Sequence, residues 1–138
     1  DKIVIASAPR TQNTEAYTAY LRGKHVMRVR SEENLYKALR EFRHATEVDP
    51  EFAPAWAGVA NAYSLLGNYE YRAETEVLPL ASDAVDKALL LNPDLAEGWA
   101  ARGLLLRELC TAKDSDENTV WAEVESLFEK PVVETEDA

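Results

Sequence analysis

The sequence has few of the residues that mark disulfide-rich, turn-rich or membrane-spanning chains. Its 138 residues include one cysteine, Cys110, so no disulfide can form within the chain. Five glycines and six prolines are too few for an all-β or low-complexity chain. No apolar run approaches the ~18–20 residues of a membrane helix, so no membrane insertion is expected. Because 46% of the residues are hydrophobic, we predict a helical or mixed domain with its own core.

Charge is distributed unevenly along the chain, whose formal net charge is −10. Residues 1–44 contain nine lysines and arginines and five acids, residues 45–113 contain five and eleven, and residues 114–138 contain one and nine. A negative chain repels phosphate backbones, so nucleic acid would have to bind the basic residues near the start. These are Arg22, Lys24, Arg28, Arg30, Lys37, Arg40 and Arg43. We interpret them as solvated side chains and predict no nucleic-acid partner.

Internal repetition is the strongest pattern in the sequence. Residues 43 apart match, so that Asp49-Pro50 returns as Asn92-Pro93 and Trp56 returns as Trp99. Three longer series share this spacing: Leu35, Leu78 and Trp121; Ala38, Ala81 and Val124; Phe42, Val85 and Phe128. Repetition with a period of roughly 20–50 residues predicts an array of stacked supersecondary units. We therefore expect three units, the third of them degenerate.

Each unit is predicted to contain two amphipathic helices. Apolar residues such as Leu39 and Phe42 recur three or four positions apart, which places them on one face of a helix. Thr14 and Ser31 are expected N-caps, and Pro54 suits a first helical turn. The predicted helices are 14–29, 32–47, 54–66, 72–91, 95–112 and 119–130.

These residues resemble the signature of the tetratricopeptide repeat family. The resemblance consists of small residues where two helices touch, a large ring beside them and a proline at the turn. In the first helix the matching residues are Trp56, Val59, Ala60 and Tyr63. In the second helix they are Ala38, Phe42, Ala45 and Pro50. The resemblance implies an all-α superhelix of about three antiparallel helix pairs over residues 14–130. We expect residues 1–13 to be a partly disordered lead and residues 131–138 a disordered acidic tail.

The period is longer than the ~34 residues of ordinary tetratricopeptide repeats. Nine extra residues fall within 70–79, and a second excess falls over 111–118; we expect both between the helices of a pair. Over about residues 14–109 the chain resembles repeats with an enlarged turn, which commonly form the C-terminal part of bacterial signalling proteins. The resemblance implies a cytoplasmic or periplasmic part of a larger, membrane-anchored protein. A start without methionine also predicts a fragment.

No pattern in the sequence indicates catalysis or a cofactor. His25 and His44 lack the spacing of zinc ligands, and Cys110 follows an apolar stretch that suggests packing at a helix end. Four residues fit positions 1, 3, 5 and 12 of a calcium loop: Asp114, Asp116, Asn118 and Glu125. The sixth position is Thr119, however, where the loop requires glycine, so helix capping explains the acids better. We predict no enzyme activity, no metal and no cofactor.

The resemblance also implies a binding surface on the concave side, lined by the first helix of each pair. In the family this lining lies one, five and eight residues beyond the tryptophan position, for which Tyr17 is the equivalent in the first unit. The implied lining is Thr18, Arg22 and His25, then Ala57, Asn61 and Ser64, then Ala100, Leu104 and Arg107. Asn61 can hydrogen-bond a peptide amide, and Arg22 and Arg107 can pair with carboxylates. This predicts a non-catalytic scaffold for a peptide or protein.

Two other interpretations stay open at this point. The chain is alternatively a regulatory sensor domain of a bacterial transcription regulator, cyclase or kinase, which responds to a small ligand or by oligomerising. The predicted lining is alternatively an ordinary solvated surface of an array that functions through subunit contact. The aromatic residues at repeat positions are expected in the core, namely Trp56, Trp99, Trp121, Tyr17, Tyr63 and Phe42. Uncovered apolar residues in the last helix, around Phe128, predict self-association.

Overall fold

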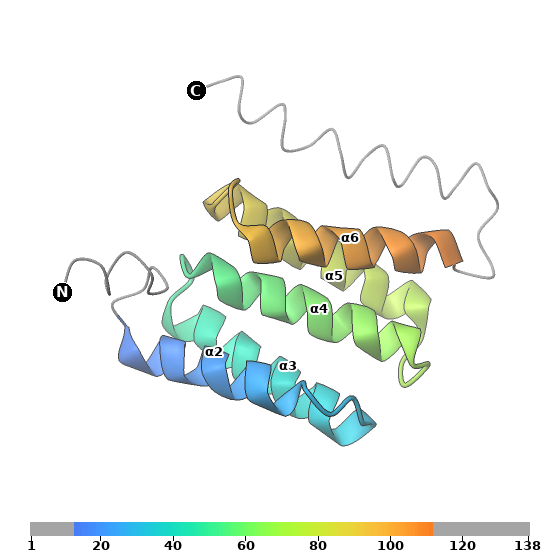
Figure 1. Cartoon of the computed structure of the whole chain (residues 1–138), viewed down its shortest axis with the longest axis horizontal. Helices are drawn as coiled ribbons and strands as arrows, with labels where there is room; N and C mark the ends of the chain where they lie inside the picture. Colours follow the sequence, from blue (N-terminus) through green and yellow to red (C-terminus); the bar gives the residue numbers. More distant parts are fainter. Residues whose placement is uncertain (1–12, 112–138) are drawn as a thin grey trace.

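The computed structural model describes residues 13–111, which contain five α-helices and no strand (Figure 1). They are α2 (Thr14–Val26), α3 (Glu32–Val48), α4 (Ala53–Asn68), α5 (Glu74–Leu91) and α6 (Ala96–Thr111). Consecutive helices run in opposite directions and pack against each other, and α4 also contacts α2 and α6. None of these five helices combines the length and hydrophobicity of a membrane span. The all-α prediction is confirmed.

The N-termini of the helices confirm two of the three predictions made from capping residues and proline. Ser31 caps α3 as predicted, because its Oγ accepts a hydrogen bond from the Asn34 backbone N–H at 3.2 Å. Pro54 lies in the first turn of α4, also as predicted. The Thr14 prediction is wrong: Asn13 is the cap of α2, and its Oδ1 accepts from the Ala16 N–H at 3.1 Å. Asparagine is at least as good an N-cap as threonine, so the helix can begin with Asn13 as its cap and Thr14 as its first residue.

Several predictions fall outside the described residues. They concern the lead 1–12, the calcium-pattern residues, the helix 119–130 with its aromatic side chains and self-association, and the acidic tail 131–138. The extra residues within 70–79 can be placed, and the expectation that they lie between helices is only partly right. Residues 69–73 connect α4 to α5, whereas residues 74–79 belong to α5.

The connection after α4 is a Schellman motif with an unusual residue in it. The Glu70 N–H donates to the Gly67 carbonyl and the Tyr71 N–H donates to the Leu66 carbonyl, both at 3.0 Å. This pair of hydrogen bonds needs one residue in the left-handed region, usually glycine. Here Glu70 occupies it with φ 59°, and no other described non-glycine residue has a positive φ. The backbone at Glu70 is therefore strained, because the residue has a Cβ; a glycine at this position would not be strained.

We expect Glu70→Gly to raise the free energy of unfolding by about 0.5–1 kcal/mol. Glycine adopts the left-handed conformation without the strain of roughly 1–2 kcal/mol that glutamate has there. Glycine also raises the conformational entropy of the unfolded chain, which offsets about half of this gain in stability. Urea denaturation of both proteins measures the difference. Glu70→Gln, which keeps the strain and loses the charge, is the control and should match the wild type. A glycine variant no more stable than the glutamine variant would contradict the explanation.

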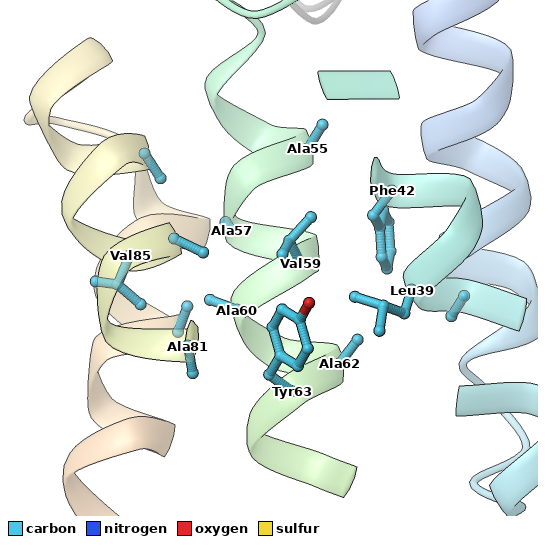
Figure 2. Close-up of a cluster of buried hydrophobic side chains, with 14 of the residues drawn as sticks. Leu39, Phe42, Ala55, Ala57, Val59, Ala60, Ala62, Tyr63, Ala81 and Val85 are labelled. Carbon is cyan, nitrogen blue, oxygen red and sulfur yellow. The ribbon is translucent and has the colours of Figure 1, made fainter. Parts of the chain in front are cut away.

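The core is centred on α4, which lies between α3 and α5. Figure 2 shows Leu39 and Phe42 of α3 on one side of α4, and Ala81 and Val85 of α5 on the other. Nearly all of α4 is buried, and the buried residues are mainly small ones that let neighbouring helices approach closely. Helix α4 therefore contributes most of the contacts that hold the described helices together.

Phe42 fixes the positions of α2, α3 and α4 relative to one another. Its side chain is 1% exposed, as the repeat pattern predicted. A Cβ added at Gly23 of α2 would lie 2.7 Å from a ring carbon of Phe42, and one added at Gly58 of α4 would lie 2.5 Å away. Only glycine fits at either place without movement of the buried ring. Two glycines from two helices thus form the slot that receives one aromatic side chain.

The turns before α4 and α6 have the same local geometry at residues 43 apart. The indole N–H of Trp56 donates to the Pro50 carbonyl at 2.9 Å, and that of Trp99 donates to the Pro93 carbonyl at 2.7 Å. The side chains of Asp49 and Asn92 each accept from the backbone N–H two residues later, at 3.1 Å in both cases. The sequence match at this spacing therefore corresponds to one local structure that occurs twice.

The prediction that the aromatic repeat positions are core residues is confirmed only in part. Phe42 and Tyr63 are buried, and Tyr17 and Trp56 are half-buried. Trp99 is 44% exposed, so its core assignment is wrong. Its indole N–H is held by the turn, which fixes the ring at the surface without burying it.

A buried arginine interrupts the apolar contact between α5 and α6. Arg102 stands 43 residues after Val59, and its side chain is 2% exposed. Its Nη2 pairs with Oδ1 of Asp86 at 2.9 Å, while its Nε and Nη1 are buried without a hydrogen-bond partner. Burial lowers the pKa of Arg102, and the Asp86 carboxylate opposes that shift. Among the described residues, Asp86 is therefore the ion-pair partner of the Arg102 guanidinium.

Candidate functional site

The residues predicted to line one surface are not brought together by the structure. Thr18, Arg22 and His25 line a groove between α2 and α3. Ala57 is 1% exposed and Ser64 is fully buried, so neither can touch a partner in this conformation. Helix α4 contacts each of the other described helices, which leaves little of its surface free.

The remaining predicted positions lie on α4 and α6. Asn61 and Leu104 are half-buried, and Ala100 is exposed. The side chain of Arg107 is 63% exposed and its Nη2 lies 3.3 Å from Oε1 of Glu108. The predicted surface is thus divided among the α2–α3 groove, the interior around α4 and the outer face of α6.

A different set of residues forms a hollow shared by the first helices of the predicted pairs. We call this cavity, about 790 Å³ in volume, the first-helix hollow. It is bounded by α2, by the start of α4 and by the turn that leads from α5 into α6. In Figure 1 the first helices α2, α4 and α6 lie in front of α3 and α5. The lining residues are Tyr17, Tyr20, Leu21, Lys24, Glu51, Ala53, Pro54, Leu91, Asn92, Asp94, Leu95 and Glu97.

The first-helix hollow combines carboxylates with aromatic rings. Glu51, Asp94 and Glu97 lie at or before the starts of α4 and α6, where negative charge is favourable. Lys24 is the single basic residue of the lining, and its Nζ is 5.4 Å from the centroid of the Tyr20 ring. The lining therefore carries more negative than positive charge.

Tyr20 is the most enclosed polar group of this hollow. Its residue is 7% exposed, and its ring meets Phe52 edge-on at a centroid distance of 5.2 Å. Burial, followed by the charge of Glu97 and by Tyr17, raises the pKa of Tyr20 to about 12. The phenol is therefore neutral at neutral pH and can donate a hydrogen bond while its ring provides apolar surface.

The second cavity is the groove between α2 and α3, about 800 Å³ in volume. It contains the three predicted residues Thr18, Arg22 and His25. Its full lining is Thr18, Leu21, Arg22, His25, Val26, Lys37, Arg40, Glu41 and His44. In contrast to the first-helix hollow, three lysine or arginine side chains and two imidazoles face a single carboxylate, so this groove is basic.

Comparison with family models, curated proteins and solved structures finds no match for this chain. A function has therefore to be inferred from the two cavities and the residues that line them.

Neither cavity has the ligands of a metal centre. Within residues 13–111, no three histidine, cysteine or acidic side chains are grouped as metal ligands would be. His25 and His44 share the α2–α3 groove, and His44 Nε2 is hydrogen-bonded to Glu15 at 2.8 Å. Cys110 is exposed, so the expectation that it packs at a helix end is wrong.

The acidic lining of the first-helix hollow was not identified from the sequence, although one signal was present. Glu51 and Asp94 are 43 residues apart and directly follow the two matched prolines. Because the turns have the same geometry, both acids lie just before the N-terminus of the following helix. Repeated acids at a repeated turn can be read from the sequence, whereas the contribution of Glu97 and Tyr20 depends on how α2 and α6 pack.

Proposed function

We propose that this chain is a tetratricopeptide-like interaction module that binds a segment of a partner protein in the first-helix hollow and catalyses no reaction. In this proposal α2–α3 and α4–α5 are successive helix pairs, α6 begins a third, and the pairs stack into a superhelix. Support comes from the turns that repeat at 43 residues and from the small residues where α4 meets its neighbours. Stacked arrays commonly bind partners on a surface built from several units.

The observation that carries the proposal is that three helices, one from each proposed unit, line a single open hollow. Its volume of about 790 Å³ lies within the roughly 300–1,000 Å³ of typical binding cavities. A cavity of this size can accept one or two side chains of an extended peptide. Because the binding surface is built from three successive units, repetition of the unit would be required to form it.

The lining favours a partner with a basic side chain. Glu51, Asp94 and Glu97 supply carboxylates, and the half-buried Tyr17 ring supplies an aromatic wall. An arginine can pair with a carboxylate through two hydrogen bonds and stack on an aromatic face at the same time. We therefore infer that the bound segment carries an arginine or a lysine.

The experiment uses fluorescein-labelled decapeptides that differ only in whether three central positions are arginine, glutamine or glutamate. Their affinity for the full chain is measured by fluorescence anisotropy. We expect the arginine peptide to bind at least tenfold more tightly than the other two. The double variant Asp94→Asn/Glu97→Gln should lose about tenfold in affinity, which corresponds to about 1.4 kcal/mol.

The matched control is Glu33→Gln/Glu47→Gln, which removes the same charge at two exposed positions of α3 outside the hollow. It should change the affinity less than twofold. Equal losses in both double variants would mean that net charge alone attracts the peptide. Binding of none of the peptides, together with stabilisation by a small metabolite, would instead favour the sensor interpretation.

A further inference from the structure

The α2–α3 groove contains two arginines whose guanidinium groups have no polar partner in the part of the chain that the structure describes. Arg22 of α2 and Arg40 of α3 line it, and neither forms an ion pair or hydrogen bond with any described residue. Lys37 is only weakly engaged, since its Nζ is 3.9 Å from Glu33 and both side chains are more than half exposed. Arginine side chains whose guanidinium groups have no polar partner among residues 13–111 are available to a ligand.

Both walls of the groove are arranged for an extended ligand. On α2, Thr18, Arg22 and His25 follow one another at spacings of four and three residues, which places them on one helix face. On α3, Lys37, Arg40 and His44 follow at spacings of three and four. Because α2 and α3 pack against each other, two basic rows border one groove. Leu21 and Val26 add apolar lining between polar groups.

We propose that this groove binds an acidic segment, rich in glutamate or aspartate, of a partner protein. This site shares only Leu21 with the first-helix hollow and has the opposite charge. Arginine recognises carboxylates through paired hydrogen bonds, and Leu21, 46% exposed, offers contact to an apolar residue between the acids. Two rows of basic side chains suit an extended peptide whose acids point alternately to either wall.

A nucleic acid fits the groove less well than an acidic peptide. The lining includes Glu41, and Glu15 contacts the lining residue His44, so carboxylates lie beside the basic rows. The whole chain has a net charge of −10, which repels a long polyphosphate but affects a short peptide less. Charge complementarity confined to one groove therefore favours a short acidic ligand.

The test measures anisotropy of a fluorescein-labelled decapeptide, in which pairs of adjacent glutamates are separated by single leucines, with the full chain; adjacent glutamates of an extended peptide point to opposite walls. Its counterpart with glutamine in place of glutamate is the negative probe. We expect the acidic peptide to bind at least tenfold more tightly, and to weaken as the salt concentration is raised from 50 to 200 mM. The variant Arg22→Gln/Arg40→Gln should reduce its affinity at least tenfold. Arg22→Lys/Arg40→Lys should lose less, because it keeps the charge but not the paired hydrogen bonds.

The matched control is Arg28→Gln/Arg43→Gln, which removes the same charge at exposed positions outside the groove and should change affinity less than twofold. Unchanged thermal unfolding of each variant confirms that the fold is intact. The proposal is overturned by equal loss in the control, by tighter binding of single-stranded DNA than of the acidic peptide, or by no preference for glutamate over glutamine. A tenfold gain in affinity after Glu134→Gln/Glu136→Gln/Asp137→Asn would also overturn it, because the chain's own acids would then be the occupant. The variant Asp94→Asn/Glu97→Gln should leave this binding unchanged, so failure here is separable from failure of the proposed function.

Discussion

Phe42→Ala should lower the free energy of unfolding by about 3–5 kcal/mol, the usual cost of deleting a buried aromatic ring. The ring is 1% exposed, lies against Gly23 and Gly58, and has its centroid 5.9 Å from that of Tyr20. Its removal leaves a cavity at the meeting point of α2, α3 and α4, and backbone contacts around it limit collapse. Urea denaturation at an unchanged m-value measures the loss.

Trp99→Ala is the control for this prediction. Both residues are aromatic and both occupy repeat positions, but Trp99 is 44% exposed. We expect its truncation to cost less than about 1.5 kcal/mol, from one hydrogen bond and from the contact of the ring with Arg102, whose Cζ lies 5.4 Å from the ring centroid. Equal losses at the two positions would mean that the ring of Phe42 is not the element that joins the three helices.

A second substitution tests the slot itself. Gly58→Ala should cost about 1–3 kcal/mol in the wild type, because the new methyl group would lie 2.5 Å from a ring carbon of Phe42. In a Phe42→Ala background the same change should be neutral or stabilising, since alanine favours a helix over glycine by about 1 kcal/mol. The same cost in both backgrounds would show that something other than the ring excludes a side chain at this position.

Much of the helical core could be predicted from the sequence because several local signals agreed. In α3 the spacing of Leu35, Ala38 and Phe42 marks a buried face, and Ser31 marks its start. The buried faces of α4 and α5 follow from the same spacing and from the match at 43 residues. These patterns depend on neighbours along the chain, so they can be recognised without knowing how the helices pack.

The candidate site was harder to predict because it depends on the rotation of α2. That helix has no tryptophan, and choosing Tyr17 as its equivalent made Thr18, Arg22 and His25 the predicted lining. The structure instead rotates α2 so that Gly23 meets Phe42, which turns Tyr20 and Lys24 towards α6.

Small residues in α4 caused the second misplacement. The resemblance places Ala57 and Ser64 in the binding surface, where a small side chain leaves room for a partner, but a small side chain suits close packing of a neighbouring helix equally well. In the structure both are buried. Composition cannot distinguish the two uses, because each requires the same lack of bulk. Charge is more informative here: Arg22 and Arg40, which have no ion-pair partner among the described residues, mark the α2–α3 groove, and the repeated acids mark the first-helix hollow.

Asp86→Ala should cost about 3 kcal/mol or more, although Asp86 is itself partly exposed. Removing one partner of a buried ion pair leaves the other charge desolvated and uncompensated, typically at a cost of about 3–5 kcal/mol. The Arg102 side chain is 2% exposed and already has two nitrogens without hydrogen-bond partners. Chemical denaturation measures the loss of stability.

Arg102→Met shows whether the stability lost in Asp86→Ala comes from the buried guanidinium that is left without its ion-pair partner. Methionine fills a similar volume without a charge, and the Asp86 side chain it leaves behind is 26% exposed and can be hydrated. We therefore expect the single Arg102→Met change to cost less than about 1.5 kcal/mol, and the double variant Asp86→Ala/Arg102→Met to be more stable than Asp86→Ala alone. The asymmetry follows from burial, because the charge that loses its partner is enclosed in one case and hydrated in the other. If the double variant is as unstable as Asp86→Ala, the carboxylate stabilises the fold through contacts other than Arg102, and α6 is held against α5 by apolar packing alone.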